Sequence, residues 1–159
     1  MKTNAARILD GLKIPYRMIE YKVDLNDLSA PNVAAKVGMP LEQVFKTLVC
    51  RLQDGEYVFA VVPGGDEVDL KKLAGAAGAK KADLAPLAEV EPLTGYVRGG
   101  VTVIGAKKPF RAFADETIVL FDEVSLSAGM RGLQIVLAPA DYLRATSATV
   151  ADLTKAVHG

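Results

Sequence analysis

The stretch "QVFKTLVC", residues 43–50, places a lysine inside a run that otherwise has the composition of a buried strand. In an extended segment alternate side chains share a face, so Lys46 falls in line with Val44, Leu48 and Cys50. A lysine on such an apolar face either extends its ammonium group to solvent at a strand end or lines a pocket. The first arrangement is the commoner one, and the stretch by itself leaves both open.

Few residues in this chain could act as a strong nucleophile, base or metal ligand. Histidine occurs only as His158 and cysteine only as Cys50, which argues against a Ser-His-Asp site, a Cys-His site and the usual zinc ligand sets. Neither a GxxxxGK[ST] loop nor a GxGxxG motif is present. We therefore expect no cofactor and no metal ion. Lysine, hydroxyl groups, tyrosine and backbone amides remain, and these groups can hold and polarise a carbonyl or a phosphate.

Two glycine-rich turns could bring the backbone close to a ligand. They are the pair Gly99-Gly100 and the turn from Gly129 to Gly132. Glycine permits such a close approach because it has no Cβ. Taken singly, each turn is better explained as an ordinary chain reversal.

The segments that carry these residues alternate between helix and strand patterns. Capping residues and apolar spacing predict helices, and alternating or continuous apolar runs predict strands. The helices are expected at 4–12, 29–38, 69–77 and 83–90, and the strands at 16–23, 44–52, 57–63, 117–121 and 133–138. The pattern predicts one mixed α/β domain over residues 1–159, with antiparallel pairs in its sheet.

The composition is that of a compact protein without a strong electrostatic bias. Half of the 159 residues are apolar, and 19 basic side chains balance 19 acidic ones. A protein that binds nucleic acid mainly through the phosphates usually has an excess of basic residues. The net charge of zero therefore does not argue for such a role. Local basic clusters do occur, at Lys71-Lys72, Lys80-Lys81 and Lys107-Lys108. No apolar run reaches the length of a membrane span, and a single cysteine is compatible with a reducing cytoplasm. We expect a cytoplasmic protein that does not bind membranes.

Four segments, in order and in spacing, resemble the YbaK/EbsC family. They are "VFKTLV" at 44–49, "DLKKLAGAAGAKK" at 69–81, "TGYVRGGVTVIGAKK" at 94–108 and "SAGMRGLQIVL" at 127–137. Members of this family are free-standing aminoacyl-tRNA deacylases, related to the editing domain inserted in bacterial prolyl-tRNA synthetases. The resemblance implies a mixed α/β (α+β) fold whose mixed sheet is strongly curved and partly barrel-like, with surrounding helices.

The resemblance also implies which residues form the site. The family's pivotal lysine falls on Lys46, so the resemblance favours a pocket over a solvent-directed ammonium group. The remaining family positions imply substrate-binding roles, and they fall on Tyr21, Thr47, Gly99, Gly100, Ser127 and Gln134.

Two departures from the family pattern concern substrate preference. Typical members have an aspartate where this chain has Gln134, and Ser-Pro where it has Thr102-Val103. Glutamine keeps hydrogen-bonding capacity but lacks the negative charge, so Lys46 would lose an electrostatic partner.

The resemblance implies a hydrolase that removes a wrongly attached amino acid from tRNA, best known for cysteine on tRNA(Pro). Mischarged aminoacyl-tRNA would be its partner, presented by prolyl-tRNA synthetase or an elongation factor, with Lys71-Lys72 and Lys80-Lys81 near the acceptor stem. Three alternatives remain open. The chain could remove another small residue such as alanine, it could bind charged tRNA without hydrolysis, or it could be a purely structural protein.

Overall fold

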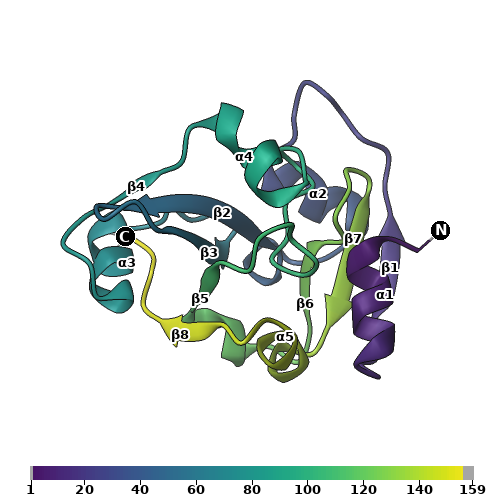
Figure 1. The fold of residues 1–159 in the computed structure, drawn as a ribbon. Helices are drawn as coiled ribbons and strands as arrows, with labels where there is room; N and C mark the ends of the chain where they lie inside the picture. The colour runs from purple at the N-terminus through teal and green to yellow at the C-terminus, as the bar shows by residue number, and fades with distance from the viewer. Residues whose placement is uncertain (1, 156–159) are drawn as a thin grey trace.

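Eight strands form two sheets in the computed structural model, which describes residues 2–155 (Figure 1). The smaller sheet is antiparallel and has the order β1 (Arg17–Glu20), β7 (Leu133–Leu137), β6 (Val124–Ser127). The larger sheet has the order β4 (Ala82–Leu84), β2 (Phe45–Leu52), β3 (Tyr57–Pro63), β5 (Arg111–Asp115), β8 (Thr149–Ala151). In it β2 runs antiparallel to both β3 and β4, whereas β5 is parallel to β3 and to β8.

The two sheets meet where β2 begins. An isolated parallel bridge between Val44 and Ser125 links the chain before β2 to β6. The predicted mixed α/β fold is confirmed. The expectation of one strongly curved, partly barrel-like sheet is wrong, because neither sheet is closed or strongly curled and the ladder does not continue from one to the other.

Within residues 2–155 five α-helices surround the sheets, and their ends follow from local sequence. They are α1 (Asn4–Gly11), α2 (Ala30–Val37), α3 (Leu70–Ala77), α4 (Leu87–Thr94) and α5 (Pro139–Thr146). Thr3 caps α1 by accepting from the amide of Ala6, and Asp69 caps α3 by accepting from the amides of Lys71 and Lys72. Two short 3₁₀ segments, η1 (Leu41–Gln43) and η2 (Glu116–Leu120), complete the structure. None of the helices within residues 2–155 is long and apolar enough to cross a membrane.

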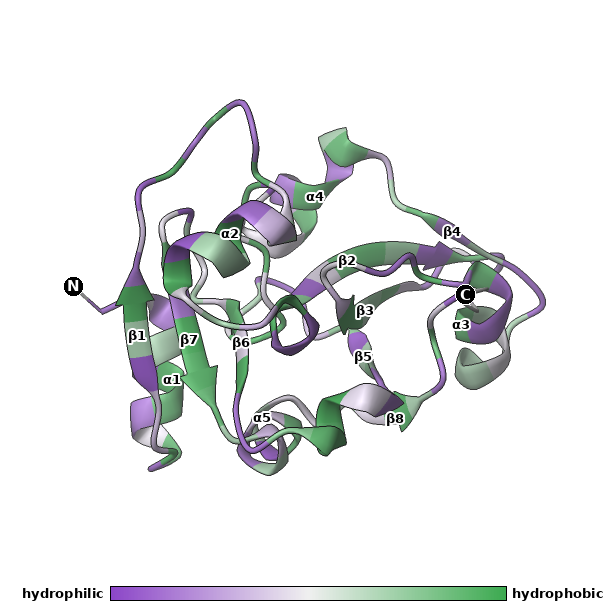
Figure 2. Cartoon of the chain, turned by 180° about the vertical axis from the view of Figure 1, so that it is seen from behind, coloured by the Kyte–Doolittle hydropathy of each residue, from purple (hydrophilic) through white to green (hydrophobic). Residues whose placement is uncertain are grey.

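The apolar cores connect the sheets, because Phe45, Val61 and Ala114 of the larger sheet belong to the same core as the smaller sheet. The smaller sheet packs with α1 and α5, and this core contains Leu9, Ile135 and Tyr142. The larger sheet packs against α3 through Val62 and Leu73. Much of β2 and nearly all of β7 are accordingly hydrophobic in Figure 2.

Three local predictions were wrong. The stretch 117–121 is not a strand, because most of it belongs to η2, and the strand lies just before it in β5. Residues 82–84 form β4, so the helix expected at 83–90 begins only at Leu87. The strand expected at 16–23 ends at Glu20, which leaves Tyr21 in the following loop.

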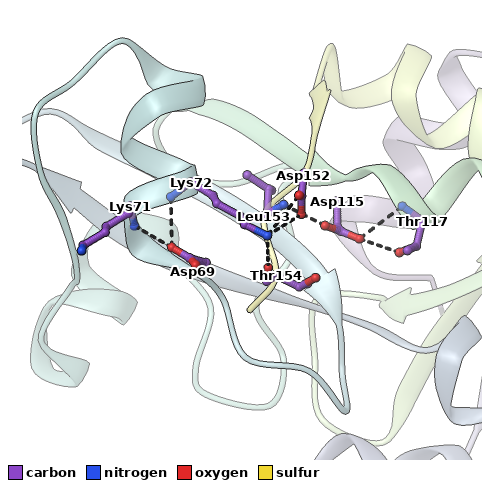
Figure 3. A network of polar contacts seen from close by, with 8 residues as sticks. All are labelled: Asp69, Lys71, Lys72, Asp115, Thr117, Asp152, Leu153 and Thr154. Carbon is purple, nitrogen blue, oxygen red and sulfur yellow. Dashed lines mark hydrogen bonds and ion pairs between the residues drawn. The ribbon is translucent and has the colours of Figure 1, made fainter. Parts of the chain in front are cut away.

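The C-terminal segment, residues 152–155, is held by a buried carboxylate (Figure 3). Asp115 is 1% exposed, and one of its oxygens accepts a hydrogen bond of 2.9 Å from the amide of Leu153. Its second oxygen accepts from the hydroxyl of Thr117 at 2.6 Å and from the amide of Thr117 at 3.2 Å. The end of β5 is thereby joined to both η2 and the C-terminal segment.

The same segment is also joined to the start of α3 (Figure 3). The amide of Asp69 donates to the carbonyl oxygen of Leu153 at 2.7 Å. The ammonium group of Lys72 donates to the carbonyl oxygen of Thr154 at 2.8 Å and forms an ion pair with Asp152 at 3.0 Å. Residues 152–155 therefore connect α3 to the far edge of the larger sheet.

Candidate active site

A cavity of about 650 Å³ opens at the junction of the two sheets. Its wall consists of the loop before α2 with the start of α2, the first part of β2, the residue after β3, the β4–α4 connection, the turn at 98–101, and single residues of β6 and β7. The volume is typical of sites that enclose a small molecule or one end of a larger one.

Lys46 lines this cavity with its side chain half-buried. Its ammonium group donates to the carbonyl oxygen of Gly64 at 3.3 Å. Burial lowers the pKa of Lys46 below its usual value, and the nearby carboxylates of Asp66 and Glu67 act in the opposite direction. The wall of the cavity thus contains a cation that is partly removed from water, which strengthens its attraction for negative charge.

Four of the six residues expected to bind substrate lie in the same wall as Lys46. They are Thr47, Gly99, Ser127 and Gln134. Ser127 and Gln134 face each other directly in the pairing of β6 with β7. The cavity therefore brings together a cation, a serine hydroxyl group and an amide from segments up to 88 residues apart in the sequence.

The other two expected residues are not part of the cavity wall. Tyr21 packs behind it, in a small cluster with Val33 and Val44, and its backbone amide donates to the carbonyl of Gly132. Gly100 is buried, and its amide donates to the carbonyl of Val97 at 2.8 Å. The amide of Gly100 is therefore engaged within its own turn.

The side-chain amide of Gln134 is held in one orientation by a residue that the sequence did not indicate. The hydroxyl of Ser125 donates to Oε1 of Gln134 at 2.8 Å, and both residues are buried. This bond occupies the carbonyl end of the amide, so the NH₂ end is available as a donor to the cavity. The cavity therefore has an amide donor at this position.

The carboxylates near Lys46 come from the loop between β3 and α3. Asp66 and Glu67 follow the buried end of β3, and the backbone of Glu67 accepts from the amide of Lys155 in the C-terminal segment. The family resemblance pointed to position 134 for the electrostatic partner of Lys46, whereas the structure places these two carboxylates near it. The acidic pair directly after "PGG" at 63–65 is the signal that could have indicated this alternative.

The mouth of the cavity is partly apolar. Leu84 is 54% exposed and Leu87 is 60% exposed, and both belong to the wall. Exposed leucines at an opening suit contact with a flat, uncharged group. Arg98 is a charged residue of the same opening.

The remaining reactive groups do not belong to this cavity. Cys50 is buried in β2, where burial raises the pKa of its thiol to about 12. Within residues 2–155 no group of three or more His, Cys, Asp or Glu side chains could hold a metal ion. His158 lies outside the described residues.

Comparisons with known proteins converge on one family. The sequence model of the aminoacyl-tRNA editing domain matches residues 28–145. A protein of Enterococcus faecalis provisionally named Cys-tRNA(Pro)/Cys-tRNA(Cys) deacylase EbsC is 42% identical over 153 residues, 96% of this chain and 93% of that protein. The multifunctional Ser/Thr-tRNA deacylase ProXp-y of Escherichia coli K12 is 35% identical over 111 residues, 67% of this chain and 66% of that protein.

A solved structure agrees with this result. It is provisionally described as a trans-editing enzyme for prolyl-tRNA synthetase, and it matches with a TM-score of 0.81 at 27% identity. The match covers 98% of this chain and 99% of that chain, so the similarity extends beyond the cavity to nearly the whole fold.

Proposed function

The chain belongs to the family of aminoacyl-tRNA editing domains, and from that membership we propose that it is a trans-editing hydrolase acting on mischarged tRNA. The substrate we propose is cysteine esterified to tRNA(Pro), as in the name of the E. faecalis relative. The observation that carries the proposal is the half-buried ammonium group of Lys46 in a cavity large enough for an aminoacylated 3′ end.

In the proposed reaction the ester bond between the amino acid and the terminal ribose is broken. The nucleophile is water or the thiol of the substrate cysteine, since the only cysteine of the chain is buried with a raised pKa. Attack places negative charge on the carbonyl oxygen, and Lys46 stabilises that charge as a nearby cation. As the carbonyl re-forms, the ribose 3′ oxygen leaves and takes up the proton that the attacking water or thiol gives up. Attack by water yields free cysteine, whereas attack by the thiol yields a cyclic thiolactone that water then hydrolyses.

The other polar groups of the cavity select and orient the substrate. Ser127 and the NH₂ group of Gln134 are donors available to the amino acid or its ester, and Thr47 lies beside Lys46 in β2. Because a pocket distinguishes neighbouring apolar side chains by only about 1–3 kcal/mol, polar contacts of this kind contribute much of the selectivity. The roles of Tyr21 and Gly100 are then indirect, since both lie behind the wall.

The proposal includes the setting in which the chain acts. Residues 1–159 form one editing domain, which acts in the cytoplasm, where tRNA is charged. The net charge of zero favours delivery of the substrate by prolyl-tRNA synthetase or an elongation factor over strong binding of free tRNA.

The first test compares the hydrolysis of Cys-tRNA(Pro), Ala-tRNA(Pro) and Pro-tRNA(Pro) by the wild type and by Lys46→Ala. We expect loss of cysteine, with kcat lowered about a hundredfold or more in the variant, as for removal of an oxyanion-stabilising donor. Lys108→Ala, a change at an exposed lysine outside the cavity, is the matched control and should retain activity. Full activity of Lys46→Ala would remove the proposed role of this lysine.

The same panel separates the alternatives. Hydrolysis of Ala-tRNA(Pro) in preference to Cys-tRNA(Pro) would indicate a different amino acid specificity, caused by the amide donor of Gln134. Binding of charged tRNA without hydrolysis would indicate a binding module. In that case Gln134→Asp, which restores the family's carboxylate, is the variant to measure next.

A further inference from the structure

Two arginines meet at the edge of the cavity. The Nε–H group of Arg131 donates to the backbone carbonyl of Arg98 at 2.7 Å. Arg98 itself lines the cavity mouth and is exposed to solvent. A side chain from the β6–β7 turn is therefore attached to the turn at 98–101.

Gly99 provides the space for this arrangement. A Cβ atom at Gly99 would lie 3.4 Å from both Cγ and Nε of Arg131, and 3.6 Å from a methyl group of Leu28. Gly99 also has a φ of +88°, a left-handed conformation that glycine adopts readily. The stem of Arg131 thus lies directly over the backbone of Gly99, which is itself part of the cavity wall.

The two turns are also packed backbone to backbone. A Cβ atom at Gly100 would lie 3.0 Å from Cα of Met130 and 3.2 Å from the amide nitrogen of Arg131. Such close packing fixes the backbone of Arg131, and the hydrogen bond to the carbonyl of Arg98 fixes the position of its guanidinium group. A cation held in this way loses little conformational freedom when it binds a ligand.

The guanidinium groups of both arginines remain available to an anion. None of the ion pairs among residues 2–155 includes Arg98 or Arg131. In two of the lysine clusters one member is engaged, because Lys72 is paired with Asp152 and Lys81 lies 3.9 Å from Asp83. Asp27, the acidic residue of the cavity wall, accepts from the backbone amide of Ser29 at 3.0 Å.

We propose that Arg98 and Arg131 form a phosphate-binding site for the terminal nucleotides of the RNA whose ester is held at Lys46. This inference rests on the proposed function. The first phosphate of the RNA is one ribose away from the ester, so an RNA chain entering the cavity must pass its rim. The planar fork of arginine matches phosphate oxygens, and contacts to phosphate set the register of a nucleic acid.

The test compares a substrate with phosphates and one without. Cys-tRNA(Pro) and cysteinyl-adenosine carry the same ester, and only the first has phosphates. For Arg98→Ala and Arg131→Lys, we expect KM for Cys-tRNA(Pro) to rise about tenfold more than KM for cysteinyl-adenosine. In Arg98→Ala, which removes a cation, the dependence of log KM on log salt should also become shallower by about one unit.

Arg7→Ala is the matched control, since Arg7 is an exposed arginine of α1 outside the cavity. Thermal unfolding of each variant shows whether the turn at 98–101 survives. If Arg131→Lys lowers stability, Arg98→Ala decides the question, because only the backbone of Arg98 takes part in the bond to Arg131. Equal changes for both substrates, or an unchanged salt dependence, would overturn the phosphate site.

Direct binding separates failure of this site from failure of the proposed function. If the wild type hydrolyses neither substrate, the proposed function fails. The phosphate site is then tested with a fluorescent ACCA oligonucleotide that carries no amino acid. Salt-sensitive binding that weakens in Arg98→Ala would support the site. Binding that is the same in wild type and variant, or no binding, would overturn it.

Discussion

The ammonium group of Lys46 lies where its charge is unfavourable for stability. Burial lowers the pKa of Lys46, and its hydrogen-bond acceptor among the described residues is one backbone carbonyl at 3.3 Å. A lysine retained in such surroundings is better explained by chemistry than by folding. Its effect on rate should therefore depend on its protonation state.

The activity should fall on the alkaline side earlier than for an ordinary lysine. The active form in our proposal is the cation, so kcat/KM is constant below the pKa of Lys46 and decreases as pH rises through it. Because that pKa is lowered from 10.5, the decrease begins at a lower pH than for a free lysine. The measurement is kcat/KM against pH, after subtraction of the uncatalysed ester hydrolysis.

Lys46→Arg provides the control for this profile. Arginine remains charged over the whole range, so the alkaline decrease should disappear, although the different geometry will reduce the rate at neutral pH. A rate that increases as Lys46 loses its proton would contradict the electrostatic role and favour a general base.

The resemblance placed Lys46, Thr47, Gly99, Ser127 and Gln134 in one site, and the structure brings them into one cavity wall. Two contributors could not be predicted. The hydroxyl of Ser125 reaches Gln134 because β6 pairs with β7 in a register that places Ser127 opposite Gln134. Arg131 reaches the cavity edge through a contact with a backbone carbonyl. Contacts of this kind depend on pairing between distant segments, which local sequence patterns do not reveal.

Three elements meet at Gly64, at the end of β3. Its amide donates to the carbonyl of Val44 at 2.7 Å, and its carbonyl accepts from Lys46. A Cβ atom at this position would lie 2.1 Å from Cβ of Ala30, the first residue of α2. The absence of a side chain at Gly64 thus allows α2 to pack against the strand pair that carries Lys46.

Gly64→Ala should destabilise the fold and reduce activity together. The added methyl group forces α2 away from β3, and overpacking of this kind costs about 1–3 kcal/mol. Ala30→Gly removes the opposing methyl group, so the double variant should recover most of the lost stability and activity. A double-mutant cycle in urea unfolding and in kcat/KM measures the coupling. Additive effects of the two changes would contradict the contact.

The elements were predicted best where a capping residue or a glycine marks an end. The ends of α1, α2 and α3 follow from Thr3, Gly38, Asp69 and Gly78. The stretch 117–121 was misassigned because "TIVLF" has the composition of a strand. In the structure Asp115 caps it as a 3₁₀ turn, and Val119 and Leu120 are 57% and 73% exposed.

At the scale of the whole molecule, the arrangement of the strands was the least predictable feature. The β2–β3 hairpin is local and was expected, whereas β3 pairs in parallel with β5 and β5 with β8. Pairing in parallel requires a long connection, and no pattern in either strand specifies its partner. For this reason the mixed α/β class and the local hairpin could be predicted from the sequence, whereas the division into two sheets could not.

Asp115 should be important for stability without contacting the cavity. Asp115→Ala leaves the buried amide of Leu153 without an acceptor and removes the bonds to Thr117. We expect the free energy of unfolding to fall by about 2–4 kcal/mol, measured by urea denaturation. Asp115→Asn retains one acceptor and should cost less. Asp122→Ala, at an exposed aspartate, is the control, and an equal loss there would contradict the explanation.

Asp115 is synthesised before the C-terminal residues that it binds, and this order affects how the nascent chain folds. Every residue of the cavity wall lies between positions 26 and 134, so all of them have been synthesised before β8 and residues 152–155. Until those last residues emerge, β5 has an unpaired edge and the carboxylate of Asp115 lacks its bond to Leu153. A nascent chain can thus contain the complete set of site residues while its larger sheet still lacks β8. Maturation of the site should therefore follow the emergence of β8 and residues 152–155 from the ribosome.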